Sequence, residues 1–533
     1  MKIRFFPKNM PDALWKRILI RTVLIGFYSF ILLVLLIAGI IGAFQIPAVS
    51  GLFFKTMLKM GWEDFPPQKP PVAEAATPPA FTSSITPQPE TASELFQWDQ
   101  VWQAHIRFNS NQWHQLSPLK IPPSPGAFSP KMTLRNPKAS RAGLLGVMGW
   151  DLPWSKAESL HFNGQIFTNI AARYKGNGTF LESKQNYKRS FKLDLNEFVK
   201  GQKLAKQETV NFHNLLADRS RMNDALGYRY FRMAGVPSPR TTFVDMTLEI
   251  DEMLPPSMLG LYLMVEKPDN KWLKDFFGKE GGAVFKPVTL TLFKYLSDNW
   301  ADYAPVYGPK SDLTDAQKQH LISTAKWFSN VSPETISNEM GQYFDIDLTA
   351  RFFAGQVILS NCDGILFNGQ NFLMVMAPET NLISFAPWDL DHSWGEFPFT
   401  GSYSDRIHAS IHQPWIGENF FVEKLFQAEI FKEAYLAAMR DQLSNTFDEA
   451  TLTHEVDHLA AILSPIVKKE SEHRFEQFQK SSLDTDQPGV ASSNPMDPNR
   501  PVHQLKRFVR ERKQSIESQL SGEEEGIHIS VEF

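Results

Sequence analysis

The stretch from Asn361 to Gly395 constrains the fold most, because it predicts two short strands joined by a tight turn. The strands are predicted over 371–376 and 382–386, and a Pro-Glu-Thr-Asn sequence supplies the turn between them. In an antiparallel hairpin, the residues before the first strand and after the second strand lie at the same end. Polar residues that flank this hairpin are therefore expected to lie close together.

Acidic and amide residues flank the hairpin on both sides. Asp363 and Asn368 precede its first strand, whereas Asp389 and Asp391 follow directly after its second strand. Oxygen ligands of this kind suit Mg²⁺, which binds carboxylates together with the phosphates of a substrate. Asp and Asn are also common turn residues, so a hairpin with ordinary turns at its end explains the same pattern.

The N-terminal segment predicts a single-pass membrane anchor. Six Lys and Arg residues precede residues 22–44, which carry no charge and are long enough to cross a bilayer. A cleaved signal peptide has a shorter apolar core, and a buried core helix is the other alternative. Few cations follow the span, so the positive-inside rule places residues 1–21 in the cytoplasm. The main body is then expected on the periplasmic or extracellular side of the inner (cytoplasmic) membrane.

The rest of the chain divides by composition. Eight prolines lie between Glu63 and Ser93, where few residues are able to form a core, and this predicts a semi-extended spacer. The globular body that follows is rich in strands over about 95–290 and in helices over about 291–521, which is the α+β pattern. The predicted organisation is a cytoplasmic N-terminus (1–21), a transmembrane helix (22–44), a Pro-rich extracytoplasmic linker (45–94), a globular domain (95–521) and a tail (522–533).

Composition excludes several classes of site. Cys362 is the only cysteine, so the chain has no intramolecular disulfide framework and no cysteine-rich zinc site. The absence of a Walker A sequence excludes a P-loop enzyme. The chain also lacks the Gly-x-Ser-x-Gly motif, so no motif indicates a serine hydrolase of that type. The net charge of −4 gives no indication that nucleic acid is a partner.

One predicted strand upstream adds a lysine to the pattern. Residues 189–195 alternate between polar and apolar side chains, and Lys192 lies on the polar face of this strand. Protein kinases use a strand lysine, a catalytic Asp five residues before an Asn that holds a metal, and a second metal-binding Asp beyond a hairpin. Asp363, Asn368 and Asp389 follow Lys192 in this order, so the pattern favours phosphoryl transfer.

The chain resembles the CotH kinase family, the spore coat protein H type of atypical protein kinase, from about residue 100 to about residue 520. The Pro-Trp-Asp-Leu-Asp and Asp-x4-Asn-x2-Asn-Phe elements are specific to this family, and the Gly-Leu-Tyr-x3-Glu element is moderately so. The segments that carry the resemblance are RYKGNGT and KRSFKLDLN within 173–196, LLADRSRMNDALGYRYFRMAGVPSPRT at 215–241, GLYLMVEKPDN at 260–270, and NCDGILFNGQNFLMV and FAPWDLDHSWG within 361–395.

This resemblance implies a divergent, two-lobed protein-kinase-like fold. Such a protein would transfer the γ-phosphoryl group of ATP to Ser or Thr hydroxyls of envelope or secreted proteins, with Mg²⁺ or Mn²⁺ as the metal. Lys286 is a further candidate for the phosphate lysine, and a surface position on a strand explains Glu266 equally well. The resemblance assigns a catalytic role to Asp363, metal contacts to Asp389, Asn368, Asp391 and Asn371, and ATP contacts to Lys192, Lys188 and Glu266.

Two observations keep alternative functions open. The chain lacks the Gly-x-Gly-x-x-Gly loop and the His-Arg-Asp sequence of conventional protein kinases, and its predicted location is one where ATP is scarce. A catalytically inactive kinase-like scaffold for envelope or coat assembly is the alternative, and a metal-dependent hydrolase that uses the same carboxylates is a third interpretation. The expected partners are a protein substrate and the membrane, and the sequence predicts no particular oligomeric state.

Overall fold

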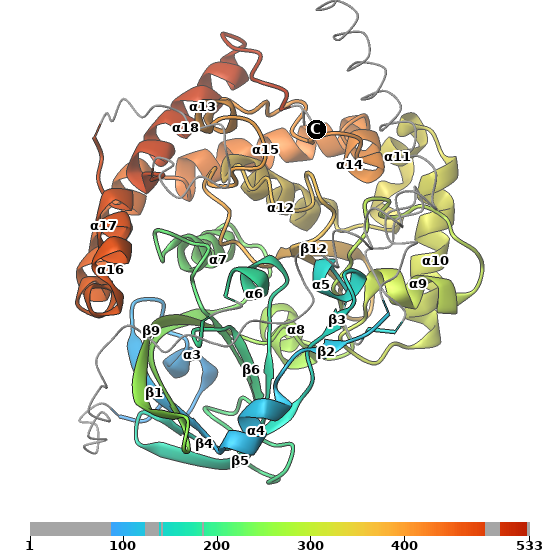
Figure 1. The fold of residues 1–533 in the computed structure, drawn as a ribbon. Helices are drawn as coiled ribbons and strands as arrows, with labels where there is room; N and C mark the ends of the chain where they lie inside the picture. Colours follow the sequence, from blue (N-terminus) through green and yellow to red (C-terminus); the bar gives the residue numbers. More distant parts are fainter. Residues whose placement is uncertain (1–86, 123–137, 140–141, 184–185, 486–501, 530–533) are drawn as a thin grey trace, which may run out of the picture. The chain divides into compact units, whose positions relative to one another are not determined.

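The structure is a computed structural model that describes residues 87–122, 138–139, 142–183, 186–485 and 502–529 (Figure 1). These residues belong to one of the two compact units of the chain, which runs from Phe65 to Phe533. They combine a large β-sheet with many helices, so the predicted α+β class is confirmed. The predicted span 22–44 and most of the linker 45–94 lie outside the described residues. Within the described ranges, no helix is both long and apolar enough to cross a membrane.

Seven strands close into a barrel in the order β1-β4-β5-β6-β7-β9-β8. Neighbouring strands are antiparallel except β1 and β8, whose parallel pairing closes the ring. Apolar side chains such as Ile106, Leu160 and Leu193 are fully buried and fill the interior. The strands are β1 (Val101–Phe108), β4 (Ser155–Phe162), β5 (Gln165–Tyr174), β6 (Phe191–Asp194), β7 (Thr209–His213), β8 (Thr241–Ile250) and β9 (Leu254–Val265).

The connection between β8 and β9 is short, because β9 begins at Leu254. Pro255 and Pro256 lie inside β9, where a register shift interrupts its pairing with β8. Proline lacks the N–H group of a ladder hydrogen bond, and a bulge is a position where this absence is tolerated.

Helix α7 (Asn223–Met233) is the next element after β7, and most of its residues are buried. The carboxylate of Asp218 accepts hydrogen bonds from the backbone N–H groups of Ser220, Arg221 and Asn223. These bonds brace the segment that leads into the helix, whose N-cap residue Met222 makes no side-chain capping bond. Because α7 is buried, its N-terminal side chains are held firmly between the barrel and the elements that follow it.

The predicted hairpin is confirmed as β11 (Phe372–Met376) and β12 (Ile383–Pro387). Strand β10 (Ala283–Phe285) pairs with β11 and completes a three-stranded antiparallel sheet. Every residue of the three strands is buried. Helix α12 (Ile346–Ile358) packs against β12, and the end of this helix leads the chain to Asp363.

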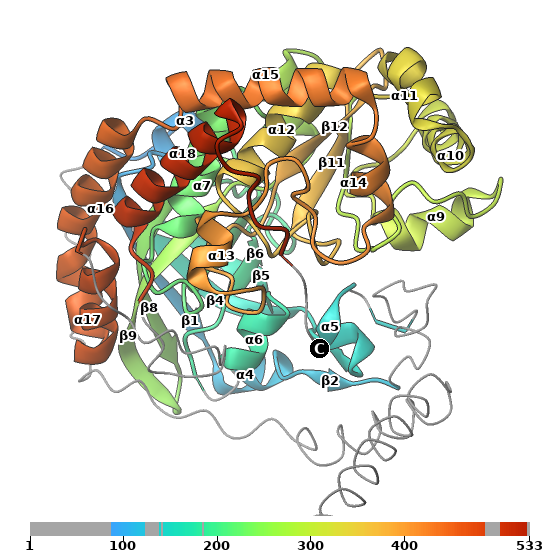
Figure 2. The ribbon, with the colours of Figure 1, turned by 90° about the horizontal axis from the view of Figure 1, so that it is seen from above.

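Helices predominate after β10, as the sequence predicts (Figure 2). Two consecutive helices, α16 (Glu449–Glu470) and α17 (Glu472–Ser481), are separated at Ser471, which is extended and caps α17. Helix α16 packs against β9 of the barrel. Other helices are α6 (Gly178–Glu182), α8 (Asn270–Phe277), α9 (Trp300–Tyr307), α10 (Asp315–Asn330), α11 (Pro333–Glu339), α13 (Tyr403–Ile407), α14 (Phe420–Leu425), α15 (Glu429–Asn445) and α18 (Leu505–Ser521).

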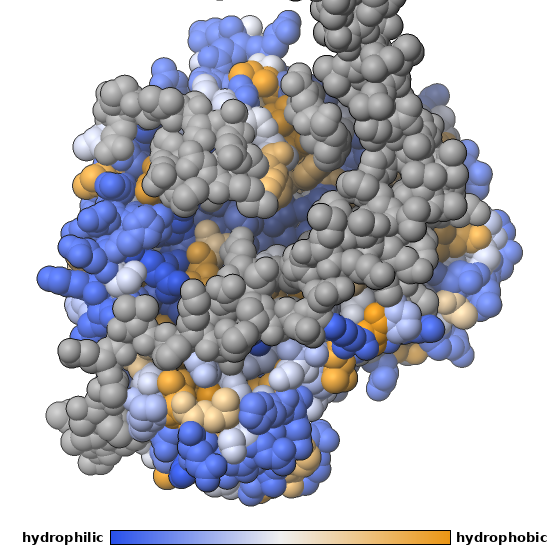
Figure 3. Space-filling view, in the orientation of Figure 1, coloured by the Kyte–Doolittle hydropathy of each residue, from blue (hydrophilic) through white to orange (hydrophobic). Residues whose placement is uncertain are grey.

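Apolar side chains are buried in two main clusters. One fills the barrel, and the other lies among α7, the three-stranded sheet and the helices of the second half of the chain. On the face drawn in Figure 3, apolar residues appear as separate patches among hydrophilic ones. The residues between the two clusters are largely polar, and they form the candidate site.

Candidate active site

A cleft of about 1050 Å³ lies between the barrel and the three-stranded sheet. One side comes from residues at or next to the ends of β5, β6 and β7, and the other from segments that follow β10 and β12. This volume is at the upper end of the range for small-ligand sites. The charged residues that line the cleft are Arg173, Lys175, Lys192, Lys267, Lys286, Lys310, Asp224, Asp389 and Asp391.

Asp363 is held by two asparagines. The Nδ2 group of Asn368 donates a hydrogen bond to one carboxylate oxygen of Asp363. The Nδ2 group of Asn371 donates to the other carboxylate oxygen and to the backbone carbonyl of Asp363, both at 2.9 Å. Burial raises the pKa of Asp363 to about 6, and Asp389 adds to this effect, whereas His392 and the two asparagines oppose it. The orientation of the Asp363 carboxylate is therefore fixed.

The loop that holds these asparagines depends on a glycine. Gly369 has a φ of +63°, and a Cβ at this position would collide with the backbone oxygen of Thr289. The Thr289 N–H donates a hydrogen bond to the Gly369 carbonyl at 2.9 Å. Asn371 is also left-handed, with a φ of +56°, and Asn tolerates this conformation better than most residues. The chain from Asp363 to the first strand of the hairpin is thus one compact loop.

Helix α7 holds the backbone on which Asp389 lies. The Asp389 N–H donates to the Tyr228 hydroxyl at 2.9 Å, and the Leu390 N–H donates to one carboxylate oxygen of Asp224 at 2.7 Å. Asp389 has a left-handed backbone, with a φ of +59°. This conformation costs about 1 kcal/mol for a residue with a side chain, so the two hydrogen bonds from α7 help to maintain it.

The same helix also fixes the residues after Asp389. The Nδ2 group of Asn223 donates to the Asp391 carbonyl at 3.0 Å, and the Asn223 carbonyl accepts from the Trp394 indole N–H at 3.1 Å. Gly227 allows this close approach, since a Cβ at its position would lie 2.8 Å from the Leu390 side chain. Helix α7 therefore fixes the position of the loop after the hairpin that contains Asp389 and Asp391, which we call the acidic loop.

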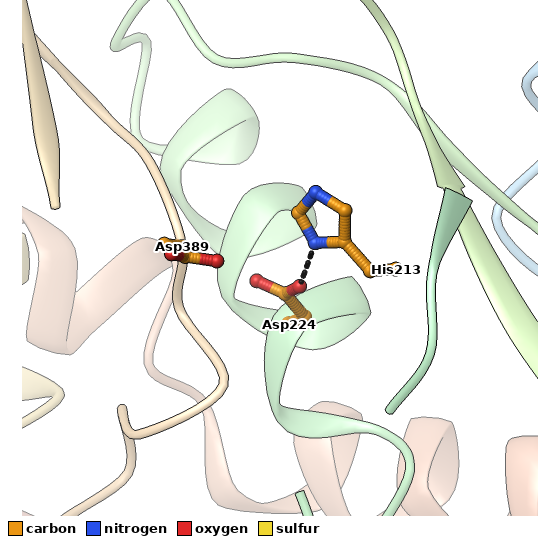
Figure 4. Close-up of side chains that lie close together, drawn as sticks. All are labelled: His213, Asp224 and Asp389. Atoms are coloured by element: carbon orange, nitrogen blue, oxygen red, sulfur yellow. Dashed lines mark hydrogen bonds and ion pairs between the residues drawn. The ribbon is translucent and has the colours of Figure 1, made fainter. Parts of the chain in front are cut away.

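Two groups of three metal-ligating side chains occur among the described residues. They are His213, Asp224 and Asp389, and Asp363, Asp391 and His392. Within each group, the potential ligand atoms all lie within 4.8 Å of one another. Figure 4 shows the first group, in which Asp224 lies between His213 and Asp389. The two groups are adjacent at the acidic loop, because the first group contains Asp389 and the second contains Asp391.

His213 uses both ring nitrogens for contacts within the protein. Its Nδ1 lies 2.9 Å from a carboxylate oxygen of Asp224, and its Nε2 lies 2.7 Å from the Nζ atom of Lys175. Because a carboxylate only accepts hydrogen bonds, we assign the proton to Nδ1, which leaves Nε2 to accept from the lysine. Burial, together with the charge of Lys175, lowers the pKa of His213 to about 3, so the ring is neutral. This histidine has no ring nitrogen left for a metal.

His392 lies among carboxylates that favour its protonated form. Its Nδ1 lies 2.7 Å from a carboxylate oxygen of Glu396. Burial alone would lower the pKa of His392, but Asp391 and Glu396 outweigh burial and raise this pKa well above its usual range. A protonated imidazole repels a metal ion, so the second group offers only its carboxylates as ligands.

The donors that remain are oxygen atoms. Asp389 and Asp391 line the cleft, and the Oδ1 atom of Asn368 is buried with no hydrogen-bond partner among the described residues. An unsatisfied buried oxygen is destabilising, and a bound cation would satisfy it. Oxygen donors without nitrogen or sulfur suit Mg²⁺ or Mn²⁺ better than Zn²⁺. These residues therefore fit the metal that the sequence predicts.

Four of the eight residues predicted from the sequence line the cleft. Lys192, Asn371, Asp389 and Asp391 line it, while Asp363 and Asn368 lie directly behind these lining residues. Lys188 and Glu266 do not line it. Glu266 is buried rather than on the surface, and its carboxylate pairs with Arg240 rather than with a lysine. In the described part of the chain, no hydrogen bond or ion pair joins Glu266 to another predicted site residue.

Lys188 forms a buried ion pair instead of lining the cleft. Its Nζ atom lies 2.6 Å from an oxygen of Glu470 in α16, and the two side chains are only 3% and 2% exposed. The same oxygen accepts a hydrogen bond from the Leu261 N–H in β9 at 2.7 Å. The pair therefore joins the barrel to α16, which is a structural role.

Lys188→Met is expected to lower the free energy of unfolding by about 3–5 kcal/mol, because Glu470 would stay buried without its main cationic partner. Arg474 lies 3.3 Å from the other Glu470 oxygen and still partly neutralises this carboxylate. The expected loss of stability is therefore near the lower end of this range. Denaturant unfolding followed by circular dichroism measures the change. The matched control Lys203→Met removes an exposed pair with Glu208 and is expected to change stability by less than about 1 kcal/mol. Unchanged stability of Lys188→Met would contradict the structural role.

Three residues at the site are absent from the sequence-based prediction, namely Lys175, His213 and Asp224. Lys175 opens the Gly-Asn-Gly-Thr segment and Asp224 lies within 215–241, so both belong to segments that carry the family resemblance. His213 lies at the end of a strand and outside these segments. A lone histidine there gives no signal until the fold places it between Lys175 and Asp224.

The sequence His454-Glu-Val-Asp-His458 matches the His-Glu-x-x-His pattern of zinc hydrolases. The structure does not support that role. Glu455, which would act as the base, is buried and pairs with Arg229 at 2.7 Å, and His458 Nε2 lies 3.0 Å from a carboxylate oxygen of Asp99. Neither histidine belongs to a group of three metal-ligating side chains in the described part of the chain.

A protein-family model described as CotH kinase protein matches residues 172–516. The matched range begins near the end of β5 and includes every site residue from Lys175 to Asp391. The chain is also similar to the inner spore coat protein H of Bacillus subtilis (strain 168), with 22% identity over 268 residues. This similarity covers 49% of the chain and 70% of that protein.

Proposed function

Because the chain belongs to the CotH kinase family, we propose that it is an atypical protein kinase, which transfers the γ-phosphoryl group of ATP to Ser or Thr hydroxyls. The observation that carries the proposal is the cleft, in which lysines and metal-binding oxygens lie together. Lysines bind phosphates, and carboxylates bind the metal that accompanies them. A hydroxyl acceptor needs a carboxylate that orients it, and Asp363 lies beside the metal-binding oxygens.

The order of the elements supports a divergent, two-lobed protein-kinase-like fold. In protein kinases a strand and the next helix carry a Lys–Glu pair, a catalytic Asp precedes a metal-binding Asn, and a second metal-binding Asp follows later. Here β7 and α7 are the strand and helix, Asp363 and Asn368 follow α12, and Asp389 follows the β11–β12 hairpin. The barrel would then correspond to the first lobe and the helical part to the second.

Asp363 is proposed to accept a hydrogen bond from the acceptor hydroxyl and to take its proton. Asn368 and Asn371 hold the two carboxylate oxygens of Asp363, which keeps one orientation. The positive charge of His392 favours the ionised form of Asp363, which is the form that accepts a proton. Phosphoryl transfer depends mostly on positioning and charge, so a fixed carboxylate is the main contribution required of the protein.

Asp389, Asp391 and Asn368 are proposed to hold Mg²⁺ or Mn²⁺. When bound, such a metal neutralises charge on the phosphates of the donor. Helix α7 fixes the backbone at Asp389 and Asp391, so their carboxylates are positioned in advance. Asn371 lines the cleft beside them, with its Nδ2 group on Asp363.

The location is proposed from the sequence alone. Residues 22–44 would anchor the chain in the cytoplasmic membrane, and the linker 45–94 would separate the globular part from it. The acceptors would then be envelope or secreted proteins, and ATP or another phosphoryl donor would have to reach the site. Protection of the globular part from protease added to spheroplasts would contradict this location.

The full chain, purified in detergent, is expected to label acceptor proteins from ATP labelled at the γ-phosphoryl group. A chelator is expected to abolish labelling, because Asp389 and Asp391 would lose their cation. ATP labelled at the α-phosphoryl group is the control and is expected to give no labelled acceptor, since only the terminal group is transferred. Release of free phosphate without any labelled acceptor would contradict a kinase and favour a metal-dependent hydrolase.

A further inference from the structure

Two lysines of the cleft, Lys175 and Lys192, have different surroundings. The Nζ atom of Lys175 lies 5.2 Å from the centre of the Trp388 ring, and its strongest charged neighbour is Asp389. The Nζ atom of Lys192 lies 5.8 Å from the Trp154 ring, and the strongest charges near it are other cations. Lys175 therefore lies at the end of the cleft that holds the metal-binding carboxylates.

A chain of hydrogen bonds connects Lys175 to the loop of Asp389. Lys175 donates to His213 Nε2 at 2.7 Å, and His213 Nδ1 donates to one carboxylate oxygen of Asp224 at 2.9 Å. The other oxygen of Asp224 accepts from the Leu390 N–H at 2.7 Å. The side chains of His213 and Asp224 are only 10% and 1% exposed. The position of Lys175 is therefore tied to the acidic loop through two buried groups.

In the proposed correspondence with protein kinases, β7 and α7 match a strand and helix that carry a different pair there. There, a strand lysine that contacts the ATP phosphates pairs with a glutamate of a helix. Here β7 ends at His213, and Asp224 is the second residue of α7. A neutral histidine brings no positive charge to a phosphate. Lys175, which follows β5, brings its amino group to the same place by contacting His213.

We propose that Lys175 binds the phosphates of the donor and that His213 and Asp224 are positioning residues that hold it there. The inference rests on the proposed function, because it requires a polyphosphate ligand in the cleft. The chain turns sharply after Lys175, since Gly176 has a φ of +92° and a Cβ on it would collide with the Thr179 side chain. This turn keeps the segment after Lys175 against the cleft, which Gly176 and Thr179 also line.

Asp224 connects the phosphate contact to the metal-binding loop. One of its carboxylate oxygens holds His213, and the other holds the backbone N–H of Leu390. Asp224→Asn is therefore expected to weaken polyphosphate binding and to raise the Mg²⁺ concentration needed for half-saturation. If Asp224 served only one of the two contacts, Asp224→Asn would change either polyphosphate affinity or the Mg²⁺ requirement, but not both.

Calorimetric titration of the full chain with Mg²⁺ and inorganic tripolyphosphate tests the proposal without requiring catalysis. Lys175→Met is expected to weaken tripolyphosphate binding about tenfold or more, which is the loss of one charge-assisted hydrogen bond. Lys175→Arg keeps the charge and is expected to retain most of the affinity. Lys192→Met is expected to lose affinity by a smaller factor, and Lys203→Met, outside the cleft, is expected to bind as the parent does.

A matched pair of substitutions tests the positioning role of His213. His213→Asn keeps an amide near Asp224 but removes the acceptor for Lys175, and it is expected to weaken tripolyphosphate binding about fivefold. His213→Gln places an amide near Lys175 and is expected to retain more affinity. A purely structural role predicts instead that both variants lose thermal stability and affinity together.

The outcomes separate this inference from the proposed function. Unaltered binding by Lys175→Met, a larger loss for Lys192→Met, or no binding by the parent chain would each overturn the inference. Tripolyphosphate binding that depends on Lys175, in a chain that labels no acceptor, would support the inference and remove the kinase proposal. Acceptor labelling that does not depend on Lys175 would support the kinase proposal and overturn the inference.

Discussion

Asp389→Asn is expected to abolish metal-dependent labelling of acceptors, with kcat/KM about a thousandfold lower, or roughly 4 kcal/mol of lost transition-state stabilisation. Asparagine has nearly the same shape, so the hydrogen bond from the residue's N–H to Tyr228 and its left-handed backbone are retained. Only the charge that is proposed to hold the metal is removed. Initial rates at saturating ATP and rising Mg²⁺ concentration measure the effect.

The matched control for this variant is Asp315→Asn. Asp315 lies at the start of α10 with its side chain 99% exposed, so its loss is expected to leave the rate unchanged. Thermal unfolding of both variants checks that the fold is intact. Parental labelling rates in Asp389→Asn would show that the metal site lies elsewhere.

Asp363→Asn is expected to lower the rate of transfer by about 10²–10⁴-fold, which is the usual contribution of a positioned acid or base. Binding of nucleotide with Mg²⁺ is expected to change little, because Asp363 is not among the oxygens proposed to hold the metal. Steady-state rates and calorimetric dissociation constants measure the two quantities separately. Equal loss of nucleotide binding in Asp363→Asn and Asp389→Asn would contradict their separate roles.

The same carboxylate gives the reaction a pH dependence. Burial raises the pKa of Asp363 to about 6, so the ionised form that accepts a proton predominates above this pH and is lost below it. The rate of the parent chain is therefore expected to fall about tenfold per pH unit below the pKa of Asp363. A bound cation favours the ionised form, so it would move the inflection to lower pH. The residual rate of Asp363→Asn is expected to lack this inflection.

The acidic part of the site was predictable because short-range patterns define it. Asp363, Asn368 and Asn371 lie within one loop, and the hairpin that follows returns the chain to the same end. Spacing along the sequence therefore implies their proximity. The strand bounds of this hairpin also agree with the prediction to within one residue at each end.

The basic part was only partly predictable, because it depends on contacts between distant parts of the chain. Lys192 follows from a strand pattern, whereas Lys188 precedes β6, which begins at Phe191, so alternation does not apply to it. Its partner Glu470 lies 282 residues away along the chain. The contact of Lys175 with His213 likewise depends on how β5 and β7 are placed in the barrel, and no local pattern encodes it.

The closure of the barrel by β1 has a consequence for shortened forms of the protein. The family match begins at residue 172, so a fragment cut there would lack β1, β4 and most of β5. Strands β6 and β8 would then present open backbone edges, at which different molecules associate. Aggregation of such a fragment would result from the unpaired edges of these strands and would not indicate a defective active site. The smallest soluble fragment of the globular part is therefore expected to begin before Val101.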